Sequence, residues 1–214
     1  MNVKEEIKEI FKNIEKEIQK RLREFSDVWD KGTKKELFIE LVFCILTPQS
    51  KARNADKAIK KLLLNKKLFN GNVEEIAEEL NIVRFKNNKS RYIIEAREKL
   101  YKNGKYILKD ILIELKKPIE MREWLVKNIK GIGFKEASHF LRNVGFYKDI
   151  AILDRHILRN LVYLNVIEEV PKTLTKKKYL EIEEKMKKES DKLGISMEYL
   201  DLVLWYKEAG EIFK

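Results

Sequence analysis

Few residues in this chain can break a helix, because its 214 residues include only three prolines and eight glycines. Lysine, glutamate, leucine and isoleucine fill the stretches between them, and apolar residues recur at intervals of three and four. That spacing is typical of amphipathic helices. The sequence therefore predicts an all-α protein, long enough to bury a core in one domain or two small lobes.

The chain has only one cysteine, which excludes several kinds of site. Cys44 lies in the apolar run LFIELVFCILT. With no second cysteine, the chain can form no internal disulfide and lacks the ligand set of an iron–sulfur cluster or a structural zinc site. We expect a buried, unreactive thiol.

Long apolar runs are also missing. The first residues, MNVKEEIKEIFKNIEKEIQKRL, are charged throughout. No segment reaches the roughly 18 apolar residues that a membrane span needs, and none has the character of a secretion signal. These absences predict a cytoplasmic protein.

The spacing of apolar residues predicts helices along the whole chain. A final helix should begin after Ser196 and stop near Gly210, where glycine favours a helix end. The expected ranges are 3–24, 34–46, 49–64, 73–80, 88–103, 106–115, 119–129, 134–144, 154–163, 175–192 and 197–207.

Positive charge is in excess, with a formal net charge of +11 and a pI near 9.4. Residues 84–109 hold nine lysines or arginines against two glutamates, and four aromatic residues lie among them: Phe85, Tyr92, Tyr101 and Tyr106. This composition favours a footprint on a phosphate backbone. A solvated helix face explains it equally well, and an acidic protein or a membrane surface would attract the same charge.

The clearest motif is KGIGFKEASHFLRNVG, residues 130–145, which follows the amphipathic stretch IEMREWLVKNI. It predicts a helix, a tight hairpin and a second helix. Gly131 and Gly133 would let the backbone turn sharply and bring free amides at the start of the second helix against a phosphate oxygen. A plain connection between two helices has the same pattern.

Lys135 lies in the first turn of that second helix, where the helix dipole disfavours a cation. The placement favours the neutral amine, and only the neutral amine attacks carbon, so Lys135 is a candidate nucleophile. The dipole contributes only about 0.3–1 kcal/mol, and burial must add the rest. The helix is expected to show a polar face of Lys135, His139 and Arg142 opposite a buried stripe of Phe134, Ala137, Leu141 and Val144.

Asp154 lies nineteen residues after Lys135. It follows the apolar run Ile150–Leu153 and opens another helix, so its simplest role is an N-cap. A second role can coexist with the first, because an N-cap carboxylate on the wall of a cleft stays ionised.

Together these residues resemble the helix-hairpin-helix, Gly/Pro-rich loop, Asp superfamily of DNA glycosylases. The hairpin lysine and Asp154 carry the resemblance, which spans roughly residues 35–165. ILTPQSKARN is similar to the family segment whose glutamine enters the DNA stack, which here is Gln49. VRFKNNKSRYI is similar to a second family segment, in which Phe85 would be the wedge residue and Lys89 would lie near the DNA backbone.

The resemblance implies a two-lobed helical fold with a cleft between the lobes. Lobe one would cover about 35–145, including the hairpin at 119–145, and lobe two about 1–34 plus 146–214. A monovalent cation would bind backbone carbonyls of the hairpin, plausibly those of Lys127, Ile129 and Ile132.

Departures from other branches narrow the resemblance to the short archaeal 8-oxoguanine DNA glycosylase/AP lyases. The chain lacks the four C-terminal cysteines of endonuclease III-like members, and it has the lysine that adenine and alkylbase glycosylases generally lack. It also leaves no room for the N-terminal β-rich domain of the long 8-oxoguanine glycosylases. In that group Trp205 would stack on the extruded base. The carboxylate of Lys214 would accept hydrogen bonds from its Watson–Crick edge, if Lys214 is the natural terminus.

The implied activity is base excision repair of 8-oxoguanine in double-stranded DNA by a monomer that needs no cofactor and no divalent metal. Lys135 would attack the sugar, Asp154 would stabilise it, and β-elimination would follow. His156 would contact a phosphate or simply lie on a helix surface.

Two other functions remain open at this point. The chain could be a glycosylase for oxidised pyrimidines, or a helix-hairpin-helix module that binds DNA without catalysis. The second predicts that Lys135 can be replaced without loss of activity.

Overall fold

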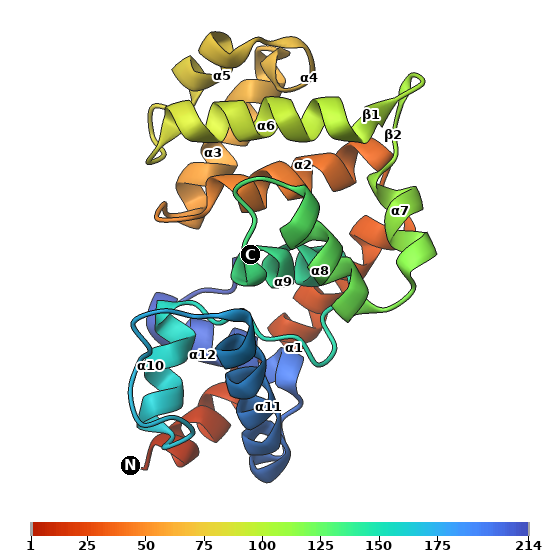
Figure 1. Cartoon of the computed structure of the whole chain (residues 1–214). Helices are drawn as coiled ribbons and strands as arrows, with labels where there is room; N and C mark the ends of the chain where they lie inside the picture. The colour runs from red at the N-terminus through yellow and green to blue at the C-terminus, as the bar shows by residue number, and fades with distance from the viewer. Residues whose placement is uncertain (1, 214) are drawn as a thin grey trace. The chain divides into compact units, whose positions relative to one another are not determined.

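A computed structural model describes residues 2–213, and the regular secondary structure of this part of the chain is almost entirely helical (Figure 1). The prediction of an all-α protein is confirmed. The helices are α1 (Val3–Asp30), α2 (Lys34–Leu46), α3 (Ala52–Leu64), α4 (Lys67–Asn70), α5 (Val73–Glu79), α6 (Lys86–Leu100), α7 (Leu108–Leu115), α8 (Pro118–Asn128), α9 (Phe134–Asn143), α10 (Arg155–Tyr163), α11 (Lys176–Leu193) and α12 (Met197–Ala209), and the strands are β1 (Tyr101–Lys102) and β2 (Lys105–Tyr106).

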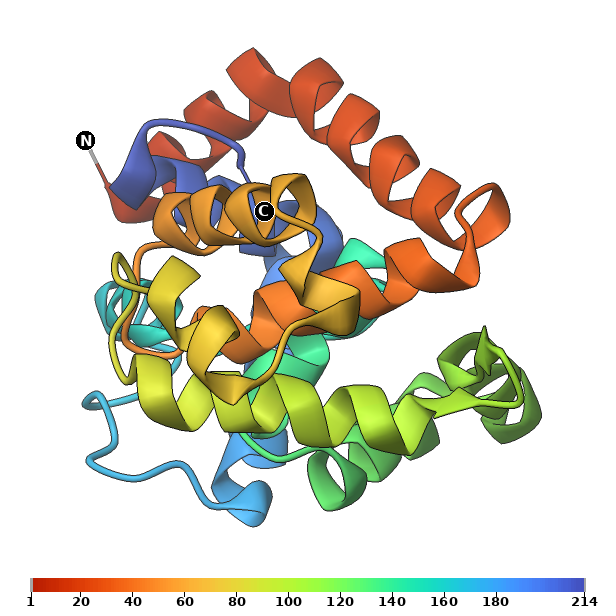
Figure 2. The ribbon, with the colours of Figure 1, turned by 90° about the horizontal axis from the view of Figure 1, so that it is seen from above.

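The strand pair β1–β2 corrects the predicted helix over 88–103, which ends at Leu100. Asn103 and Gly104 have φ angles of 50° and 79°. Positive φ at both central residues is the mark of the tight turn that joins two antiparallel strands, and Asn-Gly is its favoured sequence. This β-hairpin, formed by β1 and β2, continues from the C-terminal end of α6 (Figure 2). Helix α4 was not predicted either, and α1 continues to Asp30, beyond its expected end at 24.

The chain divides into two compact units. The terminal unit consists of residues 1–27 and 145–214, and the central unit of residues 28–144. The boundary lies inside α1, after Asp27, and not at residue 34 as the sequence suggested.

Helix α2 lies at the middle of the central unit. From Leu37 onward it is apolar on all sides except at Glu40, and α3, α6, α7 and α9 pack around it. A helix without a polar face is stable only when neighbours cover it completely. Cys44 lies on α2 and is fully buried, as expected. Thr33 begins the helix with a capping box, in which it pairs reciprocally with Glu36.

In the terminal unit, α12 packs against α10 and α11. Its first residue follows Ser196, and Gly210 ends it in a left-handed conformation, as predicted. Helix α1 joins this group through the ring of Phe11, whose centroid lies 5.6 Å from that of Tyr199. Among residues 2–213, no helix is long and apolar enough to cross a membrane.

Candidate active site

The hairpin between α8 and α9 contains two glycines, which differ in backbone conformation and in the space around them. Gly131 has a φ of +81°, and a Cβ there would lie 2.6 Å from Cδ2 of Tyr92. Gly133 has a φ of −95°, which any residue adopts, and a Cβ would meet only the end of the Glu136 side chain at 3.1 Å. The turn itself therefore requires glycine only at position 131.

Replacing Gly131 with alanine should destabilise the hairpin strongly. The left-handed backbone costs an alanine about 1–2 kcal/mol, and the clash with Tyr92 adds about 1–3 kcal/mol of overpacking. Gly104→Ala is a matched control, because Gly104 also has a positive φ, of +79°, but has nothing within 4 Å of the added Cβ. Urea unfolding should show a larger loss for Gly131→Ala, and equal losses would contradict the contact with Tyr92.

Lys135 lies in the first turn of α9 with a quarter of its side chain exposed. Its neighbour Glu136 was not expected at the site, and Oε1 of Glu136 lies 3.1 Å from Nζ of Lys135. The other carboxylate oxygen of Glu136 accepts a hydrogen bond of 3.1 Å from the amide of Gly133. A phosphate that binds the Gly133 amide must therefore replace Glu136, because an amide has one hydrogen to donate.

The predicted polar face of α9 is wrong for His139 and Arg142. Each is only 6 % exposed. The ring of His139 meets the ring of Phe43 edge-on at 5.5 Å, on the side of α9 that faces α2. Helix α8 covers another side, where Arg122 donates to Oγ of Ser138 at 3.2 Å. Two neighbouring helices cover more of α9 than its apolar stripe indicated.

Asp154 caps α10, as its position in the sequence predicted. Its Oδ1 accepts hydrogen bonds from the amides of His156 and Ile157 at 2.8 and 2.9 Å. One oxygen thus satisfies two of the amides that a helix N-terminus leaves without partners. The second carboxylate oxygen is not used in the cap.

Side chains of α11 and α12 hold the extended segment that leads to Asp154. The amides of residues 151, 152 and 153 donate to Glu183 at 2.9 Å, to Asp201 at 3.1 Å and to the hydroxyl of Tyr179 at 3.2 Å. The same hydroxyl donates to the carbonyl of Ala151 at 2.6 Å. These buried polar groups replace the strand partner that the segment lacks.

Sequence reasoning missed Tyr179, Glu183 and Asp201. One signal was present for Asp201, which interrupts the apolar run LDLVLW of the last helix. A carboxylate at a buried helix position requires donors. The donors lie about fifty residues away along the chain, and local patterns carry no information about them.

His156 and Trp205 lie together in the terminal unit, with their rings edge to face at 5.4 Å. Nδ1 of His156 is 2.8 Å from Nη2 of Arg159 and 3.2 Å from Oε2 of Glu208. Glu208 also accepts from Arg159 and from Asn160. Burial alone would raise the pKa of Glu208, but these hydrogen bonds and the charge of Arg159 lower it overall. The cluster fixes the orientation of His156 beside Trp205.

Gln49 and Phe85 are the two residues expected to enter the DNA stack, and both lie on exposed turns of the central unit. The side chain of Phe85 is 52 % exposed, and the guanidinium of Arg84 lies 5.5 Å from its ring centroid. The φ angles of Gln49 and Phe85 are 52° and 59°. A positive φ is uncommon for any residue other than glycine.

The expectation that Lys89 lies at the DNA backbone does not hold. Lys89 is only 3 % exposed, and Nζ donates to three oxygens of the protein. Burial lowers the pKa of Lys89 to about 8, and the charge of Lys135 adds to the effect. Arg97 likewise donates to the carbonyls of Leu68 and Gly71. The basic segment 84–109 is therefore not one continuous phosphate footprint.

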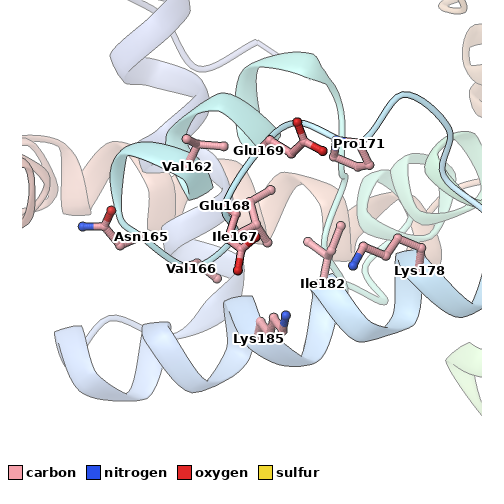
Figure 3. Close-up of a pocket in the computed structure, with 10 residues that line it drawn as sticks. All are labelled: Val162, Asn165, Val166, Ile167, Glu168, Glu169, Pro171, Lys178, Ile182 and Lys185. Carbon is pink, nitrogen blue, oxygen red and sulfur yellow. The ribbon is translucent and has the colours of Figure 1, made fainter.

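A pocket of about 490 Å³ lies elsewhere in the terminal unit, between the segment 162–171 and α11 (Figure 3). Two glutamates and two lysines line it beside apolar residues. Within the described part of the chain, none of the expected site residues borders this pocket. The predicted role of the Lys214 carboxylate falls outside residues 2–213.

The two units hold different parts of the expected chemistry. The central unit carries the hairpin glycines, Lys135 and the two exposed residues of the turns, and the terminal unit carries Asp154, His156 and Trp205. Among residues 2–213, no three histidine, cysteine or acidic side chains gather as a metal site would require.

Comparison with known proteins shows the family to which this chain belongs. A family model described as 8-oxoguanine DNA glycosylase matches residues 18–195. A protein of Fusobacterium nucleatum named 8-oxoguanine DNA glycosylase/AP lyase is 59 % identical over 98 % of this chain and 96 % of its own length. The chain belongs to the 8-oxoguanine DNA glycosylase family.

Two solved structures of 8-oxoguanine DNA glycosylases share the fold along the whole chain. The Methanocaldococcus jannaschii glycosylase/lyase, in complex with a 15mer DNA containing 8-oxoguanine, is 39 % identical with a TM-score of 0.88 and full coverage of both chains. The Thermotoga maritima enzyme is 37 % identical with a TM-score of 0.86, covering 99 % of this chain and 98 % of the other. The resemblance to the 8-oxoguanine DNA glycosylase/AP lyases is confirmed, and relatives with this name occur in bacteria and in archaea.

Proposed function

We propose that this chain is a bifunctional base excision repair enzyme that removes 8-oxoguanine from duplex DNA and then cleaves the strand at the abasic site. The observation that carries the proposal is 59 % identity, over nearly the whole chain, to a protein named for both activities. The M. jannaschii relative binds DNA containing 8-oxoguanine. Lys135 and Asp154 are our assignments for the chemistry.

Binding begins at the hairpin. The amides of Gly131 and Gly133 hold a backbone phosphate, which replaces the Glu136 carboxylate on Gly133. Amides at the start of a helix suit this task because the dipole there favours negative charge. Such a contact fixes the register of the protein on DNA without reading its sequence. His156 contacts a second phosphate.

Extrusion of the damaged nucleotide follows. Phe85 and Gln49 fill the space that the base leaves, which offsets the few kcal/mol that unstacking costs. Trp205 stacks on the extruded base. Its indole nitrogen is buried and has no hydrogen-bond partner among the described residues.

The chemistry then needs a stabiliser and a nucleophile. As the glycosidic bond breaks and its electron pair leaves with the base, Asp154 stabilises the positive charge that develops on the sugar, as carboxylates do in glycoside hydrolysis. The neutral amine of Lys135 bonds to C1′ and loses a proton, and opening of the sugar ring gives a Schiff base. Removal of a C2′ proton then expels the 3′ phosphate, and water releases the lysine.

The monovalent cation that the resemblance implied is assigned here to the carbonyls of Lys127, Ile129 and Ile132. The first two close α8, where the helix dipole is negative. The Ile129 carbonyl accepts only a long bond of 3.3 Å from the Ile132 amide. A bound ion would steady the hairpin.

The enzyme works as a monomer in the cytoplasm, on the chromosome.

Excision assays on two matched duplexes test the choice of base. One duplex contains 8-oxoguanine and the other thymine glycol, with the same flanking sequence and the same opposite strand where pairing allows. We expect faster single-turnover excision from the first. Preference for thymine glycol would point to an enzyme for oxidised pyrimidines, and cleavage of neither duplex would point to a binding module without catalysis.

A further inference from the structure

The turns that carry Gln49 and Phe85 share an unusual backbone. Both residues adopt the left-handed conformation, with φ of 52° and 59°. Residues other than glycine keep such a conformation only where their surroundings impose it, and they gather at functional sites. The buried side chain of Lys89 bonds the first turn, and the side chains of Ser50 and Asn54 link that region to the second turn.

Lys89 projects from the first turns of α6 into the turn at 46–50. Its ammonium donates to the carbonyls of Leu46 and Pro48, each at 2.7 Å, and to Oγ of Ser50 at 3.1 Å. An ammonium has three hydrogens and no acceptor, so these bonds use it fully. The acceptors flank Gln49 on both sides, which fixes the backbone through which Gln49 reaches the surface.

Ser50 connects this turn to the second one. Besides accepting from Lys89, its hydroxyl oxygen accepts from the amide of Arg84 at 3.0 Å. Asn54 adds a parallel link, because its side-chain amide donates to the carbonyl of Ile82 at 3.0 Å. The backbone just before Phe85 is thus tied to the backbone just after Gln49.

The position of Lys89 is unfavourable for a cation by itself. The side chain is 3 % exposed, and it lies close to the N-terminus of α6, where the dipole disfavours positive charge. A buried ammonium is tolerated only when its hydrogens find acceptors. The three acceptors all belong to the turns, so losing the amine would remove the donor of two carbonyls and leave the Ser50 hydroxyl with the Arg84 amide as its donor.

We propose that Lys89 and Ser50 are positioning residues, which hold Gln49 and Phe85 together in the conformation that enters the DNA stack. The inference rests on the proposed function for the roles of Gln49 and Phe85. It assigns no DNA contact to Lys89. The clamp formed by Lys89 and Ser50 sets both inserted side chains before DNA arrives, which lowers the cost of ordering them during base extrusion.

Amide hydrogen exchange in the free protein tests the clamp without any substrate. In Lys89→Met, the amides of Ser50 and Arg84 should exchange about tenfold faster or more, because their local opening loses its main restraint. The amide of Glu75 is an internal reference, since Asn72 caps it in a helix start that Lys89 does not touch. Unchanged exchange at Ser50 and Arg84 would overturn the proposal.

A duplex with 2-aminopurine beside 8-oxoguanine tests the effect on base extrusion. At saturating protein, Lys89→Met and Gln49→Ala should each slow the fluorescence rise by about tenfold. If Lys89 acts through Gln49, the double variant should be no more than about twofold slower than either single variant. A fully multiplicative loss of about 100-fold would mean that Lys89 acts independently of the turn.

The salt dependence of DNA binding separates positioning from direct contact. A lysine that touches a phosphate contributes about one unit to the slope of log affinity against log salt. Lys89→Met should leave this slope unchanged, and a reduced slope would overturn the proposal. Lys86→Met is the matched control: it removes the same charge at the same helix start, from an amine that bonds Asn81 and not the turn, and should leave the fluorescence rate unchanged.

Ser50→Ala provides a second variant that keeps the charge in place. Lys89 then retains both carbonyls, while the Ser50 hydroxyl is lost as an acceptor for both Lys89 and the amide of Arg84. We expect faster exchange at Arg84 and a slower fluorescence rise, and an unchanged rate in both measurements would overturn the role of Ser50. Wild-type protein that fails to excise 8-oxoguanine would defeat the proposed function alone, because hydrogen exchange still decides whether the clamp exists.

Discussion

Replacing Lys135 with glutamine should abolish the covalent adduct that borohydride traps on a duplex containing 8-oxoguanine. Glutamine keeps most of the side chain, but its amide nitrogen is not a nucleophile. Loss of a covalent nucleophile lowers turnover by on the order of 10⁴-fold or more. Strand cleavage should therefore fall to background, measured by gel electrophoresis under single-turnover conditions.

The fold should survive this change. The variant loses the ion pair of 3.1 Å between Lys135 and Glu136. Because a quarter of the Lys135 side chain is exposed, this pair contributes no more than about 1 kcal/mol to stability after screening by solvent. Lys130→Gln is the matched control, because it removes one charge from the same hairpin and breaks a more exposed pair of 2.9 Å with Glu95. That variant should still be trapped. An adduct that persisted in Lys135→Gln would identify another residue as the nucleophile.

The sequence predicted most helices because their signals are local. The hairpin motif, the N-cap at Asp154 and the glycine that ends α12 are all formed by residues within a few positions of one another. The strand pair after α6 was missed although its Asn-Gly turn is also local. The helical spacing of apolar residues continues across this turn. The Asn-Gly pair, which favours a positive φ at both positions, is the stronger signal and predicts a turn between two strands.

Burial of polar residues could not be predicted, because it depends on how many neighbours a helix has. Periodicity shows one apolar stripe on α9, but α2 and α8 both pack on that helix and enclose His139 and Arg142. Lys89 was assigned to the DNA backbone from the resemblance of its segment to a family motif, and its burial depends on acceptors more than thirty residues earlier in the chain.

Asp154→Asn should separate the two roles of Asp154. An asparagine oxygen can still accept from the amides of His156 and Ile157, and asparagine is as good an N-cap as aspartate. The free energy of unfolding should therefore change by less than about 1 kcal/mol. The negative charge is lost, however, and removing one electrostatic stabiliser of a transition state typically costs about 10²–10³-fold in rate.

Thr175→Ala gives the opposite pattern and serves as the control. Thr175 caps α11 in the same unit by accepting from the amide of Lys178 at 3.3 Å. Its loss should cost about 0.5–2 kcal/mol of stability and leave excision unchanged. Urea unfolding and single-turnover excision, measured on both variants, distinguish the cap from the charge. If Asp154→Asn excised 8-oxoguanine at the wild-type rate, Asp154 would be a helix cap and another group would stabilise the sugar.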